Sequence, residues 1–136
     1  MWIGRQLARI IKRYGKVEAK DYFIGLFKIN TDSDGVEYLT ELNDSIHAGY
    51  RRITVKGVKA KLLIFELVHI TNNEDIAYPM AINDWGVITG VCTFEDILSR
   101  DAFNRAKINP IQINNSQRFC IRKNEIDMTT LTIDLS

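Results

Sequence analysis

The sequence predicts an all-β fold, an antiparallel two-sheet β-sandwich of the immunoglobulin-like or jelly-roll-like kind, preceded by one amphipathic helix. Two observations carry this prediction. About seven short segments rich in β-branched and aromatic residues are separated by turn-forming residues, and no strand–helix alternation occurs. The chain has 136 residues, 46% of them hydrophobic, which suits one domain. We expect an N-terminal arm over residues 1–20 and a β-sandwich over residues 21–136.

Residues 2–16 show the one helical pattern of the chain. Apolar residues recur at spacings of one, three and four, and Gly15 ends the pattern. We predict a docking helix whose apolar stripe and basic residues form its interface: Trp2, Ile3, Leu7, Ile10, Ile11, Tyr14, Arg5, Arg9 and Arg13. An amphipathic helix does not say whose surface it covers. It could lie on its own domain, on a neighbouring subunit or on a membrane surface.

Charge is unevenly distributed along the chain. Residues 1–20 hold six basic side chains and one acidic side chain, a net charge of +5. Because the whole chain carries +1, residues 21–136 carry −4. A basic segment on a mildly acidic body is typical of an arm that docks on an acidic neighbour or on nucleic acid.

The β pattern starts with residues 22–29, which are aromatic and β-branched and are followed by a polar turn. The further predicted strands cover residues 50–56, 62–71, 76–82, 87–94, 117–123 and 128–135. Pro79 restricts its segment to an edge or bulged strand. Residues 95–108 fit either a short helix or an irregular loop. We predict a structural corner at Pro79, Trp85 and Gly86, where Trp85 packs in a hydrophobic core or an interface.

The segment from Asn30 to Glu41 matches the spacing of a calcium-binding EF-hand loop. Oxygen-bearing residues stand at loop positions 1, 3 and 5, a glycine at 6 and a glutamate at 12, so the weak candidate ligands are Asn30, Asp32, Asp34 and Glu41. Three features oppose this interpretation. Position 1 lacks a charge, position 8 is Glu37 instead of an apolar residue, and no second loop follows. We therefore predict no metal site and keep a calcium-binding protein as the alternative.

Catalytic templates are absent from the sequence. No nucleophile elbow, phosphate-binding loop, dinucleotide fingerprint or zinc-protease motif occurs. The two histidines are interpreted as an exposed turn residue, His47, and a structural strand residue, His69. Cys92 and Cys120 lie in apolar strand patterns and are expected to be buried, reduced thiols. We expect no enzyme activity and no cofactor.

The sequence also argues against two classes of binding partner, membranes and nucleic acids. No apolar run approaches the roughly 20 residues of a membrane span, and the basic stretch at residues 51–61 lacks an interleaved aromatic ladder. We therefore expect neither a membrane nor a nucleic-acid partner. The N-terminus shows no secretory signal, which indicates synthesis in a cytoplasm.

Several short motifs occur in a recognisable order. They are Tyr22–Phe27, the turn Asp32–Gly35, Glu41, Gly49–Arg52, Ile76–Pro79, Ala81–Thr89 and Leu131–Ile133. In this order and spacing the chain resembles a family of small tailed-phage virion proteins, described as short tail-fibre-like or minor structural proteins. The segment from Pro79 through Trp85-Gly86 to Thr89 is the most specific part. The chain departs from the family after Thr89, where Gly90–Phe94 replaces a His-Phe-rich strand and no glycine-rich hairpin follows.

The resemblance implies a non-enzymatic bacteriophage virion protein of the tail, the collar or the capsid surface, made in the host cytoplasm. Its partners would be other phage virion proteins, in multiple symmetric copies, with the N-terminal helix as docking arm. A third hypothesis is a carbohydrate-binding adhesin on the virion. Its only candidate residues are Trp85 and Tyr50.

Overall fold

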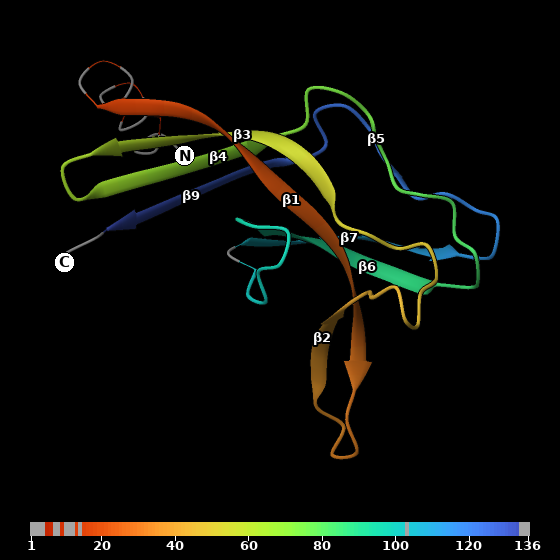
Figure 1. Ribbon diagram of the computed structural model, residues 1–136. Coiled ribbons are helices and arrows are strands. Elements are labelled where there is room, and N and C mark those ends of the chain that lie inside the picture. Colours follow the sequence, from red (N-terminus) through yellow and green to blue (C-terminus); the bar gives the residue numbers. More distant parts are fainter. Residues whose placement is uncertain (1–4, 7–8, 10–12, 14, 103, 134–136) are drawn as a thin grey trace.

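The structure is a computed structural model that describes residues 5–6, 9, 13, 15–102 and 104–133. Its nine strands are β1 (Lys16–Thr31), β2 (Glu37–Glu41), β3 (Ile53–Leu62), β4 (Phe65–Thr71), β5 (Ile76–Ala77), β6 (Gly86–Phe94), β7 (Asn104–Ile113), β8 (Cys120–Ile121) and β9 (Asp127–Ile133). Seven of them form one antiparallel sheet in the order β7-β6-β1-β3-β4-β9, with β2 paired to β1, while β5 and β8 pair with each other (Figure 1).

Strand β1 organises the sheet because it is 16 residues long and is paired along both edges. Its first half pairs with β3, and residues Phe23–Phe27 pair with β6 on the other edge. Its last part pairs with β2, and Phe27 faces both Gly90 of β6 and Glu41 of β2. Strand β2 therefore lies on the same edge of β1 as β3.

The sheet is nearly closed into a barrel-like shape. Strands β7 and β9 stand at the two ends of the strand order, yet the Asn104 side-chain amide donates a hydrogen bond of 3.1 Å to the hydroxyl of Thr130. Side chains from both ends also meet in one core, including Met128 of β9 and Ile113 of β7. No backbone pairing joins β7 to β9 among the described residues, so the facing edges of these two strands remain unpaired.

The core lies on the inner face of the sheet and beneath the β5–β8 pair. Trp85 is fully buried, and its indole nitrogen donates to the Ala48 carbonyl at 2.9 Å. The Tyr50 ring lies edge-on to Trp85 and parallel to Tyr78. Gly86 follows Trp85 with a φ of 84°, a backbone conformation that favours glycine. The corner around Trp85 is thus a core position.

Two arms extend from this core in Figure 1. One is the hairpin formed by the end of β1 and by β2, in which residues 31–40 are all exposed. The other is a four-stranded extension formed by the start of β1 with β3, β4 and β9. Both arms are continuous with the sheet because β1 runs from one to the other.

The all-β prediction is confirmed, and several finer predictions differ from the structure. One nearly closed sheet replaces the expected two-sheet sandwich. The segment predicted as strand 62–71 contains a turn at Leu63, whose φ is 54°. The ambiguous residues 95–108 include the start of β7, and the strand expected at residues 76–82 covers only Ile76–Ala77. Residues 16–20, which were expected to be part of the N-terminal arm, belong to β1.

The predicted N-terminal helix falls mostly on residues outside those that the structure describes. Its apolar stripe, Trp2, Ile3, Leu7, Ile10, Ile11 and Tyr14, lies entirely there, whereas Arg5, Arg9 and Arg13 are described and exposed. Among the described residues, no helix is long and apolar enough to cross a membrane.

Candidate interaction site

A second, smaller apolar cluster lies on the outer face of the sheet, opposite the core. Phe27, Cys92 and Phe94 form it, since residues paired across antiparallel strands share a face. Gly90 leaves room for the Phe27 ring, because an added methyl group there would overlap it. Ala102, from the β6–β7 connection, packs against the cluster. The outer face is therefore closed at this point by a loop instead of a second sheet.

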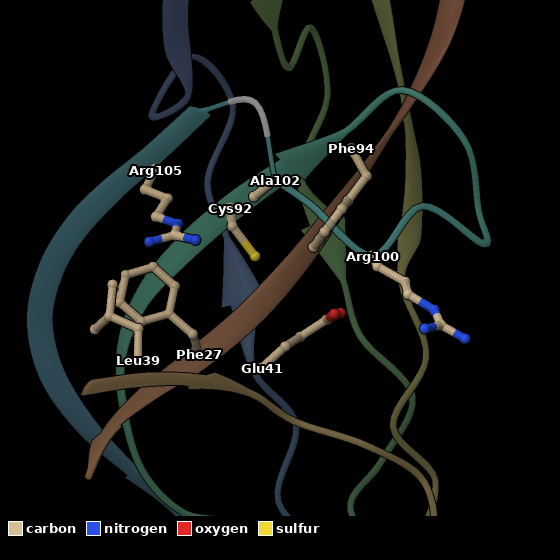
Figure 2. Close-up of a pocket in the computed structure, with 8 residues that line it drawn as sticks. All are labelled: Phe27, Leu39, Glu41, Cys92, Phe94, Arg100, Ala102 and Arg105. Atoms are coloured by element: carbon tan, nitrogen blue, oxygen red, sulfur yellow. The ribbon is translucent and has the colours of Figure 1, made fainter. Parts of the chain in front are cut away.

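A pocket of about 120 Å³ opens beside this cluster, as Figure 2 shows. Strands β1, β2, β6 and β7 and the β6–β7 connection line it with Phe27, Leu39, Glu41, Cys92, Phe94, Arg100, Ala102 and Arg105. Burial and the nearby Glu41 carboxylate raise the pKa of the Cys92 thiol to about 12, against the opposing effect of Arg52 and Arg105. The thiol is therefore neutral near pH 7. Pockets for small molecules are typically about 300–1,000 Å³, so this one is too small for most ligands.

Two larger hollows lie elsewhere and are open to solvent. One, of about 450 Å³, lies between β3 and the connection from β4 to β5. The other, of about 340 Å³, lies along the seam between β7 and β9. Both are lined by strand edges and turns.

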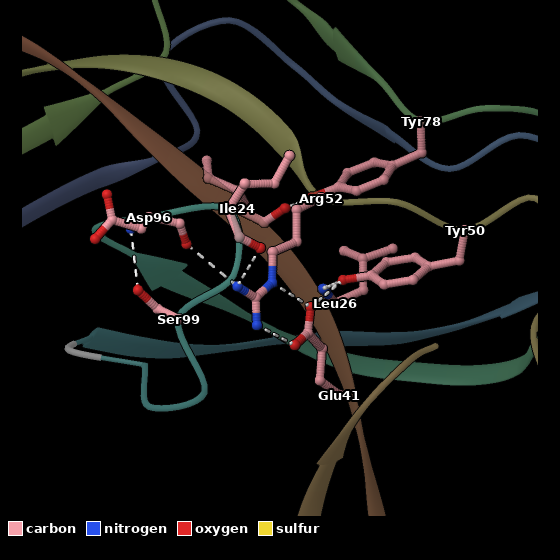
Figure 3. A network of polar contacts seen from close by, with 9 residues as sticks. Ile24, Leu26, Glu41, Tyr50, Arg52, Tyr78, Asp96 and Ser99 are labelled. Carbon is pink, nitrogen blue, oxygen red and sulfur yellow. Dashed lines mark hydrogen bonds and ion pairs between the residues drawn. The ribbon is translucent and has the colours of Figure 1, made fainter. Parts of the chain in front are cut away.

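The main polar network of the outer face joins Glu41, Tyr50 and Arg52 (Figure 3). Arg52 donates from Nε to Glu41 Oε2 at 3.0 Å and from Nη2 to Glu41 Oε1 at 2.8 Å. The Tyr50 hydroxyl donates to Glu41 Oε2 at 2.5 Å and accepts from the Leu26 amide at 3.1 Å. The Glu41 carboxylate is thus held by three donor contacts.

Gly25 of β1 provides the space for this network. A methyl group on Gly25 would lie 2.8 Å from the Tyr50 hydroxyl and closer still to Glu41 Oε2. Burial, together with the charge and hydrogen bond of Glu41, raises the pKa of Tyr50 far above its ordinary value. Burial alone would lower the pKa of Arg52, but the hydrogen bonds and charge of Glu41 outweigh it and raise that pKa. Tyr50 therefore stays neutral and Arg52 stays charged near pH 7, which is expected of a structural network.

Arg52 also holds the β6–β7 connection against the sheet. Its Nη1 donates to the carbonyls of Asp96 and Ile97, at 3.3 and 2.9 Å. Its guanidinium lies 3.4 Å from the centre of the Phe94 ring. One side chain thus joins the end of β2, the start of β3 and the loop that covers the outer face. The network braces the hairpin against the body of the sheet.

The hairpin arm ends in a well-defined turn. The Asp32 carboxylate accepts hydrogen bonds from the amides of Asp34 and Val36, both at 2.9 Å. Gly35 has a φ of 80°, which suits the turn that joins two antiparallel strands. Beyond the turn, Val36, Tyr38 and Leu39 are 59%, 50% and 39% exposed. The hairpin arm therefore presents the apolar side chains of Val36, Tyr38 and Leu39 on a backbone that the turn holds in place.

The structure does not bring the four candidate calcium ligands together. Asn30 pairs with Tyr38, while Glu41 pairs with Phe27 several residues away from the turn. The Glu41 carboxylate is bound by Arg52 and Tyr50, and one Asp32 oxygen caps backbone amides. Within the described part of the chain, no group of three or more His, Cys, Asp or Glu side chains could hold a metal ion.

The structure also places Pro79 and the two histidines. Pro79 lies between the buried Tyr78 and the exposed Met80, beside the core. His47, expected to be exposed, is only 7% exposed, and its Nδ1 accepts a hydrogen bond of 3.1 Å from the Asn43 amide. His69 lies in β4 and contacts Asp127 at 2.7 Å.

The two cysteines differ from the expectation of two buried thiols. Cys92 is buried, whereas Cys120 is exposed because it points away from the core in the short strand β8. The hairpin arm and the Glu41–Arg52 pair were not predicted from the sequence. The dipeptide Asp34-Gly35, a strong hairpin signal, could have revealed the hairpin.

Comparison with known proteins gives no relative. No protein-family model matches the chain, and no curated protein or solved structure matches it. The resemblance to tailed-phage virion proteins therefore rests on the sequence motifs alone.

Proposed function

We propose that this protein is a non-enzymatic structural subunit of a bacteriophage virion, which assembles through protein–protein contacts. The observation that supports assembly most is the hairpin arm of β1 and β2. It extends away from the body in Figure 1 and exposes Val36, Tyr38 and Leu39. A two-stranded hairpin is marginally stable by itself, and this one is braced by the Glu41–Arg52 pair. A braced, exposed arm with an aromatic side chain suits contact with another protein.

The distribution of charge supports contacts between copies. Asp32, Asp34 and Glu37 lie at the tip of the hairpin, whereas the basic residues of the N-terminal segment precede β1. Lys16, the first residue of β1, is also basic, and the 16 residues of β1 separate it from the acidic tip. The acidic tip and the basic start therefore lie at opposite ends of β1. Opposite charges at opposite ends suit a head-to-tail contact between neighbouring copies.

The virion assignment is supported by the family resemblance, whose motifs extend from Tyr22 to Ile133. Localisation in the virion and partnership with other phage virion proteins are parts of the same proposal.

Substitution in the hairpin tests this proposal. We expect that Val36→Asp combined with Tyr38→Asp lowers incorporation of the protein into particles at least several-fold, measured by quantitative mass spectrometry. Both side chains are exposed, so the thermal unfolding midpoint should stay close to that of the wild type. Ile82→Asp is the matched control, because Ile82 is 68% exposed and lies away from the hairpin. Wild-type incorporation of the hairpin variant would refute the role of the hairpin.

A further inference from the structure

One face of the four-stranded arm is apolar toward the free end of its strands, and the other face is polar. Four apolar residues form a row directly across its strands, because Val17 pairs with Ala60, Ala60 with Leu67, and Leu67 with Leu131. Ile133, two residues beyond Leu131 on β9, extends the same face. We call this surface the arm face.

The opposite face of the arm is polar and internally paired. Lys59 lies 3.2 Å from the Glu66 carboxylate, and Lys20 lies 2.6 Å from that of Glu95. Lys20, Lys59 and Glu66 alternate with residues of the arm face along β1, β3 and β4, whereas Glu95 follows the end of β6. The contrast marks the arm face as the side of the sheet that needs an apolar partner.

The residues at the centre of the arm face are buried and those at its rim are exposed, so a partner of limited size would be enough to cover the exposed part. Ala60 and Leu67, at its centre, are 5% and 7% exposed and form a small cluster with Leu62. Val17 and Leu131, at the two ends of the row, are 49% and 42% exposed, and Ile133 is 57% exposed. The rim therefore keeps apolar surface that an added element can bury.

We propose that the arm face is the docking surface for residues 2–14 of the same chain. The place where this segment joins the sheet is the first argument. Only Gly15 separates Tyr14 from β1, and Val17, the first residue of the apolar row, lies on the arm face itself. A tether this short gives a very high effective concentration, which favours the segment's own sheet over that of another copy.

The length and the apolar stripe of residues 2–14 both fit the arm face. A helix over residues 2–14 would be about 20 Å long. Four strands spaced by about 4.8 Å span roughly 14 Å from the first to the fourth. The helical pattern of the sequence places Leu7 and Ile10 on one stripe, which matches the apolar character of the arm face.

Docking in this way directs the basic residues of the segment away from the sheet. Arg5 and Arg9 lie off the stripe and are exposed in the structure. The segment would thus convert an apolar face into a basic one. This inference deepens the proposed function and rests on it only for the last step, in which the basic surface contacts an acidic partner.

Cross-linking within the full-length protein tests the docking. In a Cys120→Ser background, Leu7→Cys is combined with Val58→Cys, which lies on the arm face and is 40% exposed in the wild type. The control combines Leu7→Cys with Lys61→Cys, on the opposite face of the same interior strand. Cys92 is 3% exposed and should not compete. A short bismaleimide should join Leu7→Cys to Val58→Cys within one chain, with little product at Lys61→Cys.

Every other result overturns the proposal. Equal yields at the two positions would show that the segment does not choose the arm face, and no product at either would show that it docks elsewhere. A product between two chains would assign the arm face to a second copy.

A second measurement guards against a misfolded cysteine variant. The rate of maleimide labelling at Val58→Cys alone should rise several-fold when Leu7→Asp and Ile10→Asp are added, while the rate at Lys61→Cys stays unchanged. An unchanged rate at Val58→Cys would contradict the docking. Neither experiment involves particles, so failure here leaves the incorporation result for the hairpin intact, and the reverse also holds.

Discussion

Arg52 and Glu41 form a two-point ion pair, with nitrogen–oxygen distances of 2.8 and 3.0 Å, that fixes the end of β2 to the segment entering β3. The pair is shielded from solvent, since the side chains are 13% and 24% exposed. Its position explains how a projecting hairpin keeps one orientation relative to the core.

Replacing Arg52 should therefore destabilise the protein substantially. Arg52→Ala leaves the Glu41 carboxylate without its main partner and frees the carbonyls of Asp96 and Ile97, so we expect a loss of about 3 kcal/mol in the free energy of unfolding. Urea denaturation measures it. Lys56→Ala is the control, because the Lys56–Asp21 pair is 76% and 51% exposed and such pairs contribute little. Equal losses in the two variants would contradict a structural role for Arg52.

A methyl group at Gly25 should disrupt the same network from the other side. Gly25→Ala displaces the Tyr50 hydroxyl and the Glu41 carboxylate, and we expect it to cost about 1–3 kcal/mol. Because the network is already disturbed, adding Arg52→Ala should cost less than it does alone. Gly35→Ala is the comparison. It meets no atom within 4 Å and acts only through its φ of 80°, so its cost should add fully to that of Arg52→Ala. Additive costs for Gly25→Ala would refute the coupling.

The stability of the protein should fall when the pH is lowered from 7 to 5. Burial and the nearby Lys28 lower the pKa of His47, although the Asn43 backbone partly opposes this. The unfolded chain therefore binds a proton more readily than the folded one, and the folded state loses stability as the pH falls below about 6.5. His47→Gln should flatten this part of the curve of unfolding free energy against pH. An unchanged slope in the variant would show that another group is responsible.

The two thiols should react at different rates with a thiol reagent at pH 8. Cys120 is exposed, whereas Cys92 is buried with its pKa raised to about 12, so one thiol per chain should react quickly and the other only on unfolding. In Cys120→Ser, the fast phase should disappear. A fast phase that persists would mean that Cys92 is accessible in the folded protein.

The sequence predicts the β class and most strand positions well because local patterns determine them. Alternation in residues 87–94 corresponds closely to β6, and Trp85 is a core residue as its pattern indicates. The partners of each strand depend on contacts distant in sequence. Nothing local in residues 22–29 shows that β1 extends to Lys16 and Thr31 and pairs with three strands.

The candidate site was harder to predict for the same reason. Glu41 was identified as a possible calcium ligand from its spacing in the chain. Its actual partners, Tyr50 and Arg52, come from a separate segment. The arm face likewise results from the register between four strands. Its first strand begins in residues that were expected to belong to the N-terminal arm.

The most direct test of the account is the number of copies of this protein in purified virions. Quantitative mass spectrometry, with the major capsid protein as internal standard, measures it. A structural subunit is predicted to be present at a fixed copy number that corresponds to a symmetry of the particle, unchanged by high-salt washing that removes adsorbed protein. Absence from washed particles, or a copy number that varies between preparations, would contradict the account.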